Sequence, residues 1–108
     1  MKWCKNVYVT DDVADKKRKI LHRLRAGKLQ FNVYAIVLPL GTDGIMEIYP
    51  AYVFCQKIYK KQHVYVIGLA SGREAACELA GKIALECYSK NMDFDIKKFI
   101  RERQGGLS

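Results

Sequence analysis

The chain has 108 residues, half of them apolar or aromatic, and a formal net charge of +8 at pH 7. This length predicts a single domain over residues 1–108, and no apolar run approaches the roughly 20 residues of a membrane-spanning helix. The first residues also lack the apolar stretch of a secretion signal, so we expect a cytoplasmic globular protein that does not contact a membrane.

The cysteines exclude the common small metal-binding folds. The chain has four of them, and they form no C-x-x-C pair and have no histidine at zinc-finger spacing. We therefore expect no metal and no cofactor, and free thiols in a reducing compartment. The cysteines are Cys4, Cys55, Cys77 and Cys87.

The first predicted unit is a strand that leads directly into a helix. Residues 5–10 are rich in β-forming side chains, and Asp11 and Asp12 follow as candidate caps of the helix. Gly27 supplies the left-handed residue that ends many helices. The apolar residues between them recur at helical spacing on one face: Val13, Ile20, Leu21 and Leu24.

The other face of this helix is strongly basic. Residues 15–28 hold seven basic side chains against one acid, while the rest of the chain is close to neutral. Such a face predicts contact with a polyanion, and nucleic acid is the polyanion we expect. A solvated face without a ligand is the alternative for a charged helix. The candidate nucleic-acid-binding residues are Lys16, Lys17, Arg18, Lys19, Arg23 and Arg25.

A hairpin is predicted in the middle of the chain. Residues 30–38 become apolar on both sides of their alternation, which is typical of a central strand covered on both faces. A turn over residues 40–44 and a second strand over residues 45–49 follow. Pro50 ends that strand.

The segment 51–61 is ambiguous, because a helical and a period-two pattern both fit it. We favour a short helix. The neighbouring aromatic side chains are more than one short segment easily buries, so we predict that they form an interface, with completion of the core as the alternative. They are Tyr49, Tyr52, Phe54 and Tyr59.

The last part of the chain predicts a strand and two helices. Residues 64–68 read as a strand, and Ser71 with Glu74 matches the S-x-x-E capping box of a helix start. We expect an inner stripe of Ala76, Leu79, Ala80, Ile83, Cys87 and Tyr88, and an outer row of Glu74, Glu78, Lys82 and Glu86. Asp95 should cap a final helix, with Phe94 packed on Phe99, and residues 104–108 should fray.

Together these elements predict an α/β fold. We expect a small mixed, partly parallel sheet of three or four strands, flanked by helices in two or three layers.

Ligands of such folds collect at the carboxyl ends of parallel strands. Three loops qualify: residues 10–12, 39–44 and 69–73. The last is preferred as an anion site, because Ser71, Gly72 and Arg73 offer a hydroxyl, close backbone approach and a guanidinium. The capping box is the competing explanation of Ser71.

No catalytic residues are predicted, because His22 and His63 both lie outside these loops and no nucleophile has an evident base. The leading hypothesis is therefore a non-enzymatic binding domain that acts through a protein partner or a second copy of itself. The alternatives are a nucleic-acid-binding module that uses helix 15–28 and a binder of a phosphorylated small ligand at the 69–73 loop.

Overall fold

A computed structural model describes residues 2–39, 46–55, 64–93 and 95–103. Its radius of gyration over the Cα atoms is 13.0 Å, the value expected for a compact chain of this length. The predicted turn at residues 40–44, Tyr59, the packing of Phe94 and the fraying of residues 104–108 lie outside the described residues.

The centre of the fold is a four-stranded mixed sheet with the order β1-β4-β2-β3. The strands are β1 (Lys2–Val9), β2 (Val33–Pro39), β3 (Glu47–Pro50) and β4 (Val64–Ser71). β1 and β4 are parallel, and β2 is antiparallel to both β4 and β3. The predicted mixed sheet and the antiparallel β2–β3 pairing are confirmed.

The two inner strands are buried along most of their length. Residues 35–38 of β2 and 66–70 of β4 are all buried, which confirms that β2 is a central strand covered on both faces. Continuous apolar runs of this kind are typical of strands with helices on both sides.

The pairing of β2 with β4 contains one irregularity. Ile36 pairs with Gly68 and Val37 with Val66, so Ile67 is an extra residue in the manner of a β-bulge. Gly68 lets the strands approach closely here, because a Cβ atom at this position would lie 3.0 Å from Cδ1 of Ile36 and that side chain would have to shift.

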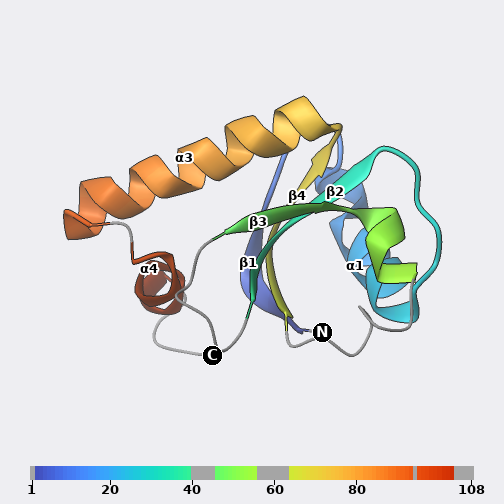
Figure 1. Cartoon of the computed structure of the whole chain (residues 1–108), viewed down its shortest axis with the longest axis horizontal. Coiled ribbons are helices and arrows are strands. Elements are labelled where there is room, and N and C mark those ends of the chain that lie inside the picture. Colours follow the sequence, from blue (N-terminus) through green and yellow to red (C-terminus); the bar gives the residue numbers. More distant parts are fainter. Residues whose placement is uncertain (1, 40–45, 56–63, 94, 104–108) are drawn as a thin grey trace.

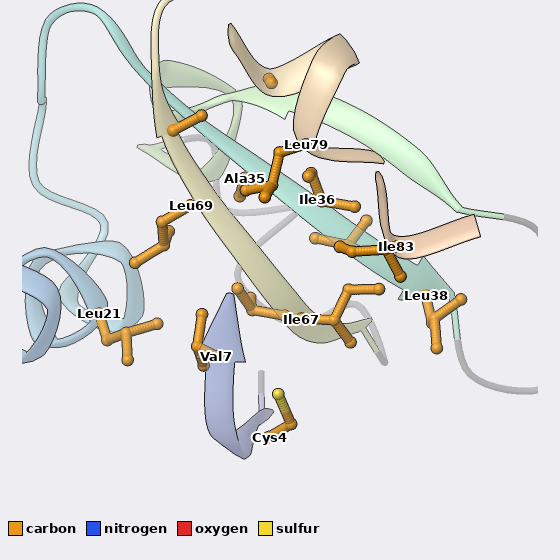
Figure 2. Close-up of a cluster of buried hydrophobic side chains, with 14 of the residues drawn as sticks. Cys4, Val7, Leu21, Ala35, Ile36, Leu38, Ile67, Leu69, Leu79 and Ile83 are labelled. Carbon is orange, nitrogen blue, oxygen red and sulfur yellow. The ribbon is translucent and has the colours of Figure 1, made fainter. Parts of the chain in front are cut away.

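Helices cover the two faces of the sheet, as Figure 1 shows. A 3-10 turn (Ala14–Lys16), α1 (Lys17–Ala26) and a second 3-10 segment, η2 (Ala51–Cys55), lie on one side. α3 (Arg73–Asn91) and α4 (Ile96–Arg103) lie on the other. In Figure 2, Leu21 approaches the strands from the α1 side, and Leu79 and Ile83 approach from the α3 side.

α1 follows its predicted inner face and end but not its predicted start. Ile20, Leu21 and Leu24 are buried, and Gly27 adopts φ 70° at the C-terminus. No side chain caps either the 3-10 turn or α1, so the prediction that Asp11 and Asp12 cap this helix is wrong. Asp12 instead accepts a hydrogen bond from the Thr10 hydroxyl at 2.7 Å.

The start of α3 also differs from the prediction. Ser71 is the last residue of β4, where it pairs with Val33, and Gly72 at φ 92° occupies the N-cap without a side-chain bond. The capping box of Ser71 and Glu74 is therefore absent. Strand pairing with β2 holds Ser71 in extended backbone, and its hydroxyl accepts a hydrogen bond from Asn32 Nδ2 at 3.1 Å.

The inner stripe of α3 is largely as predicted, with two corrections. Ala76, Leu79, Ile83 and Cys87 are buried. Tyr88 is 43% exposed and so does not belong to the stripe. Glu86 does not belong to the outer row, because it is half-buried and accepts a hydrogen bond from the Tyr8 hydroxyl.

Two other local predictions are tested by the structure. Asp95 caps α4, since its Oδ1 accepts a hydrogen bond from the Lys98 N–H at 3.1 Å. Residues 51–55 form a 3-10 helix, so a short helical segment is confirmed for this part of residues 51–61. Residues 56–61 lie outside the described part.

Candidate functional site

The most distinctive surface of the molecule is the basic face of α1, formed by Lys16, Lys17, Arg18, Lys19, Arg23 and Arg25. Lys17 is half-buried and the other five are exposed. α1 has no acid in its first turn, which holds Lys17, Arg18 and Lys19. Within the described residues, no carboxylate lies within ion-pair distance of any of these side chains. Lys16 ends the 3-10 turn and the other five lie on α1, so the six predicted residues share one continuous helical segment, with Asp15 as the single acid beside them.

Beside this face lies an aromatic residue that the sequence interpretation missed. Trp3 of β1 is half-buried, with the guanidinium carbon of Arg25 at 3.9 Å from its ring centroid. The His22 ring meets it edge-on, at a centroid distance of 5.7 Å and an interplanar angle of 84°. β1 begins at Lys2 rather than at Lys5, so Trp3 lies within the strand. Extension of the predicted strand to these first residues was the signal that could have found it. The cation–π contact holds the indole against α1.

The predicted anion site at the 69–73 loop contains an unfavourable carboxylate. The backbone N–H of Thr10 donates to the Leu69 carbonyl at 3.2 Å, which brings the two predicted loops 10–12 and 69–73 together. The Thr10 hydroxyl, with a smaller contribution from the Ser71 hydroxyl, lowers the pKa of Asp12 below its ordinary value. An ionised carboxylate that shares the Ser71 hydroxyl repels a second anion there. Gly72 is committed to the helix start, and the anion site stays a prediction.

Arg73 lines a separate cavity. It is the first residue of α3, is exposed, and lines a cavity of about 210 Å³ together with Tyr52, Tyr34 and Cys77. The third predicted loop, 39–44, begins at the opposite end of the sheet, because Pro39 pairs with Val64 at the start of β4. The end of β2 at Pro39 therefore lies away from Thr10 and Ser71, and residues 40–44 lie outside the described part of the chain.

The predicted aromatic interface divides between core and surface. Phe54 is fully buried, and Tyr49 packs against it with ring centroids 6.0 Å apart. Phe54 thus completes the core, which was the alternative interpretation, and it is not part of a surface patch. Tyr52 is 57% exposed and Tyr59 lies outside the described residues.

A different apolar surface emerges on the outer face of α3, defined here as Leu85, Tyr88 and Met92. Leu85 and Tyr88 lie three residues apart on α3, off its buried stripe, and Met92 is the C-cap residue four positions further on. Leu85 is 69% and Met92 72% exposed, which is high for large apolar side chains. The sequence carried this signal, because neither residue falls on the buried stripe.

Two further classes of site were sought. Among the described residues, no three His, Cys, Asp or Glu side chains are placed to hold a metal ion. None of the helices in the described part is long and apolar enough to cross a membrane.

Comparison with known proteins gives no family assignment. The chain matches no protein-family model, and neither the curated proteins nor the solved structures contain a significant match.

Proposed function

We propose that this protein binds nucleic acid through the basic face of α1. The observation that carries the proposal is that the first turn of α1 holds Lys17, Arg18 and Lys19 and no acid, with only Asp15 of the preceding 3-10 turn beside them. The helix dipole places partial positive charge at this end, so cations there are unfavourable and acids are preferred. Lys19 and Arg23 are also like charges at four-residue spacing, which destabilises a helix further.

A helix start that departs from this preference for acids is most often explained by function. A line of phosphates is the ligand chemistry that such a face accommodates, since each phosphate neutralised releases counterions and contributes to affinity. The proposal therefore predicts weak binding of generic strands that falls steeply with salt.

The test is fluorescence anisotropy with labelled duplex DNA, single-stranded DNA and RNA at about 50 and 200 mM salt. The variant Arg18→Gln/Lys19→Gln/Arg23→Gln should lose most of the affinity and show a smaller salt slope, by about 0.9 on duplex DNA for each phosphate contact removed.

The matched control removes the same charge from the other side of the molecule, as Lys90→Gln/Lys98→Gln/Arg101→Gln, because these three residues are also exposed. It should retain most of the binding. Equal losses in both triple variants would mean that net charge alone attracts the strand, and no binding at low salt would refute the proposal.

Self-association through the outer face of α3 is the second candidate function, and the exposure of Leu85 and Met92 favours it. The N-terminal half of α3 carries Glu74 and Glu78, and the C-terminal half carries Lys82 and Lys90. Two copies that meet through Leu85 and Tyr88 would bury this apolar surface, with these charged side chains along the same helix.

Sedimentation velocity over a range of concentrations tests this second function. Leu85→Ser/Met92→Ser should shift the protein to monomer, while Leu29→Ser, a change at a leucine that is 58% exposed elsewhere, should not. A wild-type protein that is monomeric at the highest concentration would exclude self-association.

A further inference from the structure

A small pocket lies between β1 and α1 at the edge of the basic face. Its volume is about 180 Å³, and its lining combines two chemistries. Val7 and Leu21 are apolar and buried, and Trp3 and His22 add aromatic rings. Lys17 and Arg18 of the basic face of α1, with Cys4 and Lys5 of β1, complete the lining. We call this cavity the Trp3 pocket.

The geometry of Trp3 suits a stacking role. Arg25 covers one face of the indole ring and His22 meets its edge, so the ring is held in place before any ligand arrives and a base would stack on the opposite face. A fixed aromatic ring loses little freedom on binding, which favours its use as a platform. Base–aromatic stacking accepts every base because each has a π-face.

The neighbouring charges suit phosphates. Lys17 and Arg18 belong to the same lining as the aromatic rings, so a base that entered the pocket would keep its own phosphates beside two cations. In a duplex the faces of the bases are covered by their neighbours in the stack, and only an unpaired base offers one to a side chain.

We propose that the Trp3 pocket binds an unpaired nucleobase, so that the preferred ligand of this protein is single-stranded nucleic acid. The inference rests on the proposed function of the basic face of α1. It adds the ligand class, which the positive charge alone does not define, because duplex and single strand both present phosphates.

Trp3 itself provides the first measurement, since it is the only tryptophan of the chain. Titration with a short single-stranded oligothymidylate should quench its intrinsic fluorescence. An abasic strand of the same length and charge should bind more weakly and leave the fluorescence nearly unchanged. Equal quenching by the two strands would overturn the inference, because charge without a base would then be sufficient.

The second measurement is affinity by anisotropy with labelled strands. Trp3→Ala should weaken single-strand binding by about 5- to 150-fold and leave duplex binding within about twofold of wild type. Trp3→Phe keeps a ring and should retain most of the affinity, which separates stacking from a folding defect; circular dichroism confirms that each variant is folded.

The outcomes distinguish the two proposals. If Arg18→Gln/Lys19→Gln/Arg23→Gln loses binding while Trp3→Ala does not, the basic face binds nucleic acid and the Trp3 pocket does not take a base. If neither strand binds the wild-type protein at low salt, both proposals fail.

Discussion

α1 and α3 lie against opposite faces of the same sheet, and they differ mainly on their outer sides. Each buries an apolar stripe, with Leu24 of α1 and Ile83 of α3 fully inaccessible. On the outside, α1 presents unpaired cations, whereas the C-terminal half of α3 presents Leu85 and Met92. The inner sides are therefore fixed by the shared sheet, while the outer sides are free to carry two different kinds of contact.

If the inner sides are equivalent, truncation on either helix should cost a similar amount. Leu24→Ala and Ile83→Ala each remove a fully buried side chain and leave a cavity, so each should lower the free energy of unfolding by about 2–5 kcal/mol. Chemical denaturation measures both values.

Leu85→Ala on the outer face of α3 is the control, and it should change the free energy of unfolding by no more than about 0.5 kcal/mol. A loss of well under 1 kcal/mol in the free energy of unfolding for Leu24→Ala would show that the inner sides are not equivalent, because α1 would then not share the core that holds α3.

Patterns within one element predicted the fold well. The spacing of Ile20, Leu21 and Leu24, and Gly27 just beyond them, is read from a few neighbouring residues and matches α1. The same holds for Asp95, whose carboxylate caps the helix that follows it directly.

Pairing between distant segments explains the errors. Ser71 has the sequence of a capping residue, but β2 pairs with it through Val33 and extends β4 to that point. Phe54 packs against Tyr49 of β3. Trp3 of β1 contacts Arg25 and His22, which lie on α1. No local sequence pattern predicts these contacts. The charges of the basic face of α1 were therefore predicted from the sequence, and Trp3 beside it was not.

The two helices also differ in the residue that ends them. Both end on a left-handed residue, but α1 uses Gly27 at φ 70° and α3 uses Met92 at φ 59°. This conformation costs about 1 kcal/mol or more for a residue with a Cβ atom. Gly27→Ala should therefore destabilise the protein by about 1 kcal/mol, and Met92→Gly should stabilise it by about the same amount.

Thermal unfolding of the two variants at low protein concentration checks the opposite signs. Met92→Ala serves as the control, because alanine also has a Cβ atom and should bring no gain. Stabilisation by Met92→Ala equal to that of Met92→Gly would show that removal of an exposed apolar side chain, and not relief of the backbone, is responsible.

The smallest expected effect concerns the approach to α1, where no side chain caps the helix and Asp12 is held by Thr10 instead. The Thr10 hydroxyl is the main cause that lowers the pKa of Asp12, against a weaker opposing effect of burial. Thr10→Val should raise that pKa toward the ordinary value of about 3.9, and Thr10→Ser should keep it low.

Because the pKa is lower in the folded protein, the bond stabilises the fold above the ordinary pKa, and this contribution is lost as the pH falls through the folded value. Asp12 is exposed, so the change is measured by NMR titration of its carboxyl carbon rather than by unfolding. An unchanged pKa in Thr10→Val would mean that Asp12 is held by Ser71 and the backbone, and the entry to α1 would then depend on β4 as the start of α3 does.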